Sequence, residues 1–99
     1  MILSRMAKML YYIAESINVE GCSFAYHFIK RYETFVGAES YLHMMLNEWS
    51  EKEGLRVKTV RQDYGDLWGV MAMNDDYDVI HNMYIVATPL FMAGGEEGL

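Results

Sequence analysis

The sequence has no lysine or arginine after Arg61, although seven acidic residues follow that position. Residues 1–61 carry eight basic and seven acidic side chains, whereas residues 62–99 carry seven acidic and no basic side chains. The two parts therefore have net charges of +1 and −7, which sum to the total of −6. Positive charge is missing from one whole part of the chain.

Cysteine and long apolar runs are also scarce. Cys22 stands alone, so no intramolecular disulfide forms, and a reducing cytoplasm is the expected compartment. The N-terminal residues do not resemble a secretion signal. The longest weakly polar stretch, 79–93, is shorter than a membrane span and contains His81 and Pro89. The sequence predicts a soluble cytoplasmic protein with no membrane partner.

Apolar and aromatic residues are abundant in this sequence. Apolar residues make up 53% of the 99 residues, which excludes a disordered chain and predicts one domain over residues 1–99. Eight tyrosines and nine methionines exceed what so small a core can hold. Part of this surplus is expected at the surface, as a contact patch for a partner or as the interface of a homodimer.

Helical periodicity in the first part predicts three helices within about residues 4–54. The first follows Ser4 and has the apolar stripe Met6, Met9, Leu10, Ile13 and Ile17. The second follows Ser23, ends at Gly37 and has the stripe Phe24, Phe28, Ile29, Tyr32 and Phe35. The third begins near Ala38, ends at Gly54 and presents Tyr41, Leu42, Met45, Leu46 and Trp49 to the core.

Alternation after Leu55 predicts antiparallel strands within about residues 55–88. "LRVKTVRQ" places Val57 and Lys58 on opposite faces, and "LWGVMAM" is apolar on both faces, as in a central strand. "DYGD" and "NDD" are turn sequences. The segment at about 77–87 fits a strand or a helix, and its β-branched residues favour a strand that Pro89 ends. A frayed tail is expected at 93–99.

These elements predict an α+β fold, with an N-terminal three-helix unit followed by a C-terminal antiparallel β-hairpin or three-stranded meander. The alternative is a winged-helix-like order of elements, in which Gly37 lies at the turn of a helix-turn-helix.

The acidic turns contain aromatic residues, and this combination is typical of a surface that docks on a basic protein. Met44 and Glu48 share the outward face of the third predicted helix, which adds to such a surface. The predicted partner-binding residues are Asp63, Tyr64, Asp66, Trp68, Asp75, Asp76, Tyr77, Asp78, Met44 and Glu48.

No pattern of residues predicts catalysis, a metal or a cofactor. Asn74, Asp76 and Asp78 alternate like the first ligands of a calcium loop, but Val79 and Ile85 occupy the positions that need glycine and glutamate. Glu39 and His43 form a single pair on one helix face, and two ligands do not make a site. Cys22 has no base near it in the sequence. We expect the protein not to be an enzyme.

Two functions fit these observations. In size, acidity and tyrosine content the chain is similar to phage-encoded inhibitors of host defence nucleases, including anti-restriction and anti-CRISPR proteins, although no residue motif is shared. That resemblance implies an acidic module that docks on a basic groove of a nucleic-acid-handling protein, with no direct contact to nucleic acid.

The alternative is a winged-helix-like DNA-binding regulator, with Arg56, Lys58 and Arg61 in its wing. Four glutamates and one lysine on its third helix oppose this alternative, because DNA binding depends on neutralising phosphates.

Overall fold

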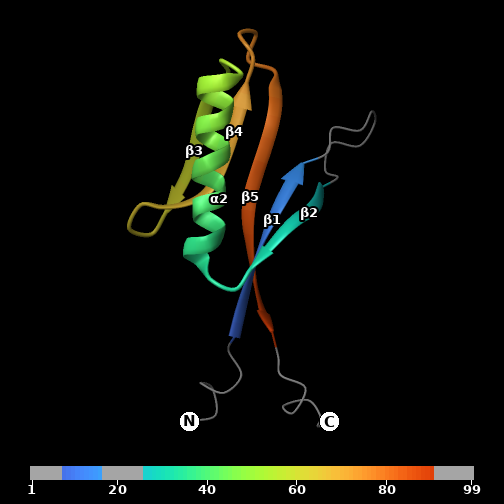
Figure 1. Cartoon of the computed structure of the whole chain (residues 1–99), viewed down its shortest axis with the longest axis vertical. Helices are drawn as coiled ribbons and strands as arrows, with labels where there is room; N and C mark the ends of the chain where they lie inside the picture. The colour runs from blue at the N-terminus through green and yellow to red at the C-terminus, as the bar shows by residue number, and fades with distance from the viewer. Residues whose placement is uncertain (1–7, 17–25, 91–99) are drawn as a thin grey trace.

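The protein is a five-stranded antiparallel sheet with one helix packed across one of its faces (Figure 1). The computed structural model describes residues 8–16 and 26–90. The order of strands in the sheet is β2-β1-β5-β4-β3. The strands are β1 (Lys8–Ser16), β2 (Tyr26–Tyr32), β3 (Arg56–Gln62), β4 (Asp66–Met73) and β5 (Val79–Leu90).

The helix α2 (Phe35–Asn47) continues as a π-helical turn, η1 (Glu48–Lys52). Its first turn is capped by Thr34, whose hydroxyl accepts a hydrogen bond from the Gly37 N–H at 3.0 Å. After η1 the chain reverses at Gly54, where φ is +67°, an angle that glycine adopts without strain. This reversal leads directly into β3.

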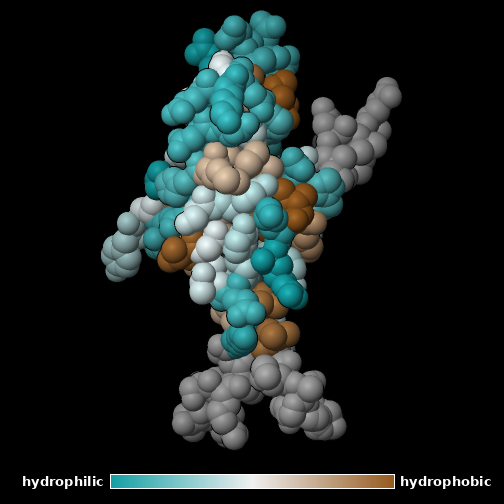
Figure 2. Space-filling view, in the orientation of Figure 1, coloured by the Kyte–Doolittle hydropathy of each residue, from teal (hydrophilic) through white to brown (hydrophobic). Residues whose placement is uncertain are grey.

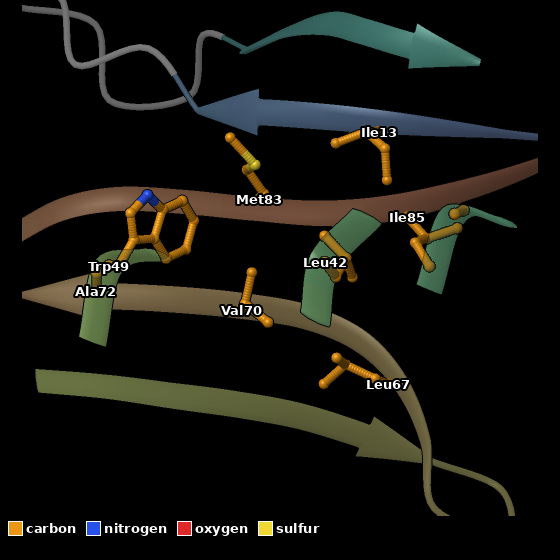
Figure 3. Packing of buried hydrophobic residues seen from close by; sticks show 9 residues of the cluster. Ile13, Leu42, Trp49, Leu67, Val70, Ala72, Met83 and Ile85 are labelled. Carbon is orange, nitrogen blue, oxygen red and sulfur yellow. The ribbon is translucent and has the colours of Figure 1, made fainter. Parts of the chain in front are cut away.

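The core lies between α2 and the sheet (Figure 3). Ala38, Leu42 and Trp49 occupy the inner face of the helix and are at most 1% exposed. They pack on side chains from the three central strands, namely Ile13, Leu67, Val70, Ala72, Met83 and Ile85. Burying each of the leucine, isoleucine, valine and methionine side chains stabilises the fold by roughly 1.5–3 kcal/mol before the loss of entropy is counted.

The three-helix unit predicted for residues 4–54 is wrong, because the first predicted helix is strand β1 where the structure describes it. This strand lies between β2 and β5, and its buried residues Leu10, Ile13 and Ala14 come from both of its faces. In a strand that is apolar on both faces, apolar and polar residues do not alternate. The spacing of the apolar residues of β1 therefore also fitted a helix. Ser4, Cys22 and Ser23 lie outside the described residues.

The second predicted helix is also wrong, since residues 26–32 form the edge strand β2. The register shifts at Ile29, which has no partner in β1, so Phe28 and Tyr32 lie on opposite faces although both numbers are even. Because of this bulge, apolar and polar residues do not alternate along β2, so the sequence lacks the pattern of a strand. Gly37 lies in the first turn of α2 and does not end a helix.

The fold is therefore mostly β, with 58% of the described residues in strands, and the α+β class is wrong. The winged-helix-like order of elements is wrong for the same reason, because one helix precedes the last three strands. The described part of the chain contains no helix with the length and hydropathy of a membrane span.

The strands predicted after Leu55 are confirmed as part of the larger sheet, but the predicted end of the last one is wrong. β3, β4 and β5 form an antiparallel meander, and the ambiguous segment is strand β5. Val57 pairs with Ala72 on the helix side, and Lys58 pairs with Met71 on the other side. Pro89 does not end this strand, which continues to Leu90. The predicted core side of the third helix is confirmed by Leu42 and Trp49, although that helix begins at Phe35.

Register defines the face of the sheet opposite α2, which we call the open face. Directly paired residues share a face, so one row crosses all five strands on this side. That row consists of Phe28, Ala14, Tyr84, Gly69 and Val60. No described element covers the open face.

Candidate protein-binding surface

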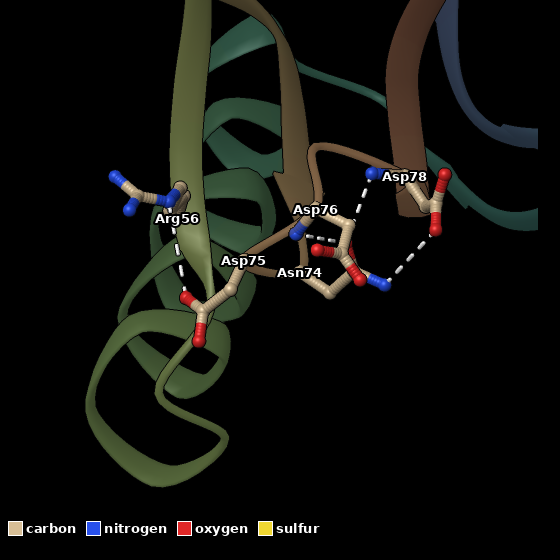
Figure 4. A network of polar contacts seen from close by, with 5 residues as sticks. All are labelled: Arg56, Asn74, Asp75, Asp76 and Asp78. Atoms are coloured by element: carbon tan, nitrogen blue, oxygen red, sulfur yellow. Dashed lines mark hydrogen bonds and ion pairs between the residues drawn. The ribbon is translucent and has the colours of Figure 1, made fainter.

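The β4–β5 turn is held in shape by the side chain of Asn74 (Figure 4). Its amide oxygen accepts hydrogen bonds from the backbone N–H groups of Asp76 and Asp78, both at 2.9 Å. Its own N–H donates to the Asp78 carbonyl at 3.0 Å. Asparagine suits this role because its short side chain bonds the backbone two residues ahead. The turn thereby fixes the positions of three aspartates.

These aspartates meet the glutamates that follow α2. β3 begins beside the end of β4, where Arg56 pairs with Met73, and Glu53 contacts His81 of β5. Helix end and turn therefore lie at one end of the molecule, which Figure 1 draws uppermost. We call this the acidic end. Its carboxylates are Glu48, Glu51, Glu53, Asp75, Asp76 and Asp78, and its cations are Lys52 and Arg56.

Six carboxylates and two cations give the acidic end a net charge of −4 (6 acidic minus 2 basic). Arg56 lies 3.9 Å from Asp75, and Lys52 lies 3.5 Å from Glu48. Both pairs are solvent-exposed, and such pairs contribute little to stability. Hydrophilic side chains cover this end in the view from the helix side (Figure 2). The negative charge therefore faces solvent.

Tyr77 is the aromatic residue of the acidic end. Its side chain is 65% exposed, and the guanidinium of Arg56 lies 5.0 Å from the ring centroid. Its φ is +67°, which is uncommon for a residue other than glycine and asparagine. The hydrogen bond from its N–H to the Asn74 carbonyl, at 3.0 Å, stabilises this conformation. An amphipathic ring is thus presented beside the carboxylates.

The structure does not bring all the predicted binding residues together. Asp63, Tyr64 and Asp66 lie in or beside the β3–β4 turn, at the other end of the eight-residue strand β4. Eight residues of strand span about 26 Å. The carboxylates of residues 62–78 therefore form two separate groups, one at each end of β4, and not one continuous patch.

The remaining predicted residues are scattered. Trp68 packs against Phe35 at the start of α2, with ring centroids 4.7 Å apart, and its indole N–H is buried without a partner among the described residues. Met44 projects from the outer side of α2 and is 54% exposed. Glu48 lies at the acidic end. Of the predicted set, five residues share that end: Asp75, Asp76, Tyr77, Asp78 and Glu48.

Two histidine–glutamate contacts were missed by sequence reasoning. His81 lies 3.0 Å from a Glu53 oxygen and stacks on Trp49, with centroids 4.7 Å apart. His27 lies 3.0 Å from a Glu15 oxygen across the β1–β2 pair. Residues far apart in sequence form both contacts, so no local pattern revealed them.

Neither contact resembles a catalytic or metal centre. No group of three or more potential metal ligands occurs among residues 8–16 and 26–90. No hydrogen bond or ion pair joins Glu39 and His43 in the described part of the chain, and the Glu39 carboxylate accepts the Leu67 N–H at 2.8 Å. That bond ties α2 to the start of β4, which is a structural role.

Tyr41 is the described residue with a clear shift in acidity. Burial raises its pKa above the ordinary value of 10.0, and the neighbouring Tyr32 and Glu15 raise the pKa further. The ring lies on the helix side, 5.4 Å from the Lys30 ammonium, and away from the acidic end.

Comparison with known proteins adds no functional information: no family model, curated protein or solved structure matches the chain.

Proposed function

We propose that the protein is a small acidic binding module, which inhibits a nucleic-acid-handling protein by docking its acidic end on a basic groove. The observation that supports this function is the gathering of six carboxylates and two cations at one end, beside the exposed ring of Tyr77. Such a surface steers a cationic partner toward it and supplies contact area once the partner arrives.

Preorganisation makes this end suitable for docking. Asn74 holds the backbone of the turn through the N–H groups of Asp76 and Asp78, so little loop ordering remains to oppose binding. Electrostatic attraction extends about 8 Å at physiological salt, which restricts it to partners that come close. A basic groove satisfies this condition, because it surrounds the inserted turn.

Inhibition follows from competition. A groove that binds phosphates offers closely spaced lysines and arginines, and the carboxylates of the acidic end provide negative charge for them. Some phage-encoded inhibitors of host nucleases, a class that this chain resembles in size and composition, present carboxylates where the target expects phosphates. The module would meet its target in the cytoplasm.

The test is capture of partners from a bacterial lysate by immobilised protein, eluted with a salt gradient. The chain offers matched variants that each remove two negative charges. Glu51→Gln with Asp76→Asn changes the acidic end, where neither carboxylate has an ion pair among the described residues. Asp63→Asn with Asp66→Asn changes the opposite end of β4.

We expect wild type and the Asp63/Asp66 variant to capture the same basic nucleic-acid-binding protein, and the Glu51/Asp76 variant to lose most of it. The captured enzyme should then be inhibited by wild type in a nuclease assay. Equal capture by both variants would show that overall charge, and not the acidic end, attracts the partner.

The DNA-binding alternative depended on a winged-helix-like order of elements, which the structure lacks. No second function of that kind is proposed.

A further inference from the structure

The open face carries aromatic side chains that contact one another. Tyr12 and Phe28 have ring centroids 4.9 Å apart, Phe28 and Tyr26 5.6 Å, and Tyr26 and Tyr84 6.2 Å. Tyr26 and Phe28 are 51% and 50% exposed. We call these four residues the aromatic cluster. It extends over β2, β1 and β5, on the side of the sheet that α2 does not cover.

Charge on the open face has the opposite sign to that of the acidic end. Register places four of the seven described lysines and arginines there, namely Lys8, Arg31, Arg56 and Lys58. Among the eleven described acidic residues, register places only Asp66 on this face, where the β3–β4 hairpin turns. Two more carboxylates, of Glu33 and Asp75, reach Lys8 and Arg56 from outside the strands, so four cations meet three carboxylates (4 minus 3, a balance of +1). The negative charge of the whole chain is therefore not the charge that a ligand meets on this side.

Two of the cations are available to a ligand. Lys8 lies 3.8 Å from Glu33, and Arg56 lies near Asp75 and Tyr77. Arg31 and Lys58 have no ion pair within the described part of the chain. They lie on β2 and β3, the two edges of the sheet, four strand spacings or about 19 Å apart. Tyr12 and Tyr84 lie on strands between these edges, and Tyr26 and Phe28 lie on β2 beside Arg31.

We propose that the open face binds single-stranded nucleic acid, with unpaired bases stacked on the aromatic cluster and phosphates held by Arg31 and Lys58. Exposed rings on a sheet offer stacking surfaces to bases of any sequence, and flanking cations follow the backbone. A duplex is excluded because its bases are already stacked and paired.

A second copy of the chain fits this face less well. Pairing two open faces would bring Arg31 and Lys58 of both copies together, and neither cation has an ion pair among the described residues. An acidic protein segment would satisfy the cations but would leave four rings without a matching flat surface. Charge and ring chemistry together therefore favour a nucleic acid strand.

This inference changes the expectation that nucleic acid makes no direct contact. That expectation used the net charge of −6, which treats the chain as uniform. Screening limits repulsion from the acidic end to about 8 Å at physiological salt, so the open face acts by its local charge. The site is independent of the proposed inhibitor function.

The test is fluorescence anisotropy of a labelled oligothymidylate of about 12 nucleotides, titrated with the protein at low salt. Wild type should bind it, and affinity should fall roughly 7- to 50-fold between 50 and 200 mM salt if two to four phosphates are contacted. Phe28→Ala should weaken binding at least about fivefold through lost stacking. The half-exposed position of Phe28 makes this variant compatible with folding.

The matched controls are charge reversals. Lys58→Glu changes the open face, and Lys52→Glu makes the same change in net charge on η1. We expect about tenfold weaker binding for Lys58→Glu and little change for Lys52→Glu. Glu51→Gln with Asp76→Asn should leave oligonucleotide binding intact, which separates this site from the acidic end.

Several results would overturn the proposal. No anisotropy change at low salt would do so, as would equal losses for the two lysine reversals. Displacement of the oligonucleotide by poly-glutamate at equal charge concentration would show that any polyanion suffices. Sedimentation of wild type as a dimer that Phe28→Ala converts to a monomer, without oligonucleotide binding, would assign the face to a second copy.

Discussion

The two faces of the same sheet differ in what they contribute. The face under α2 buries Ile13, Leu42 and Trp49 almost completely, whereas the open face leaves Tyr26 and Phe28 half exposed. Alternation along each strand supplies both faces, so the same short sequences provide the core and the outer surface. The lesson is that the covered face determines stability, while the open face and the acidic end are free to carry function.

The largest expected effect tests this division directly. Leu42→Ala should lower the free energy of unfolding by about 3 kcal/mol, because it leaves a cavity between helix and sheet. Phe28→Ala should lower it by less than about 1 kcal/mol, since half of that ring already faces water. Urea denaturation of both variants measures the difference. Similar losses would mean that the open face is part of the core.

A smaller effect is expected at the acidic end. Asn74→Ala removes the acceptor of two backbone N–H groups and should cost about 2 kcal/mol. The matched control is Asn47→Ala at the exposed end of α2, where we expect a change below about 0.5 kcal/mol. If the two variants unfold at the same urea concentration, the turn does not depend on Asn74.

The hydrogen bond between Glu39 of α2 and Leu67 of β4 should contribute less to stability than the bonds of Asn74. Glu39→Ala leaves the part-buried N–H of Leu67 without its acceptor and should cost about 1 kcal/mol. Glu39→Gln keeps an acceptor oxygen at the same position, so its stability should stay close to that of wild type. Thermal unfolding of the pair measures this difference. Equal destabilisation by both variants would indicate that the charge, and not the hydrogen bond, matters.

The smallest effect concerns pH. The pKa of Tyr41 is raised in the folded protein, chiefly by burial, so the folded state retains this proton more strongly than the unfolded state. The contribution of the protonated Tyr41 hydroxyl to the free energy of unfolding is complete below pH 10. It is lost as the pH rises through the raised pKa. Tyr41→Phe should therefore lose less stability than wild type between neutral and strongly alkaline pH. Steeper loss in the variant would contradict the sign.

The sequence predicted the C-terminal part well because local chemistry determines it. "DYGD" and "NDD" are turns, β3 alternates, and the β-branched residues of β5 favour a strand. The core side of α2 was also predicted, since Leu42 and Trp49 follow helical spacing. These features need only a few neighbouring residues.

The N-terminal part was not predicted, because partners distant in sequence determine it. β1 is buried on both sides by α2 and by residues of β2 and β5, so alternation is absent from its sequence. The bulge at Ile29 shifts the period within β2. The aromatic residues of "LYYI" and "YHFIKRY" favour strands, but the helical spacing of the apolar residues in the same segments favours helices.

The candidate site was likewise predicted only where residues that are neighbours in the sequence determine it. Asp75, Asp76 and Asp78 were predicted to be close together, and one turn holds them. Their separation from Asp63 and Asp66 depends on the direction of β4, and their proximity to Glu51 and Glu53 depends on where α2 ends. The open face was not predicted, because β1 and β2 were assigned to helices.

The most direct test of the central claim is an NMR titration of the labelled protein with an arginine-rich peptide. If the acidic end is the docking surface, we expect the largest chemical-shift changes in the backbone amides of residues 48–53 and 74–78. Changes at residues 63–66 and on the open face should be small. Changes that are largest at 63–66, or that spread evenly over the chain, would contradict a docking surface at the acidic end.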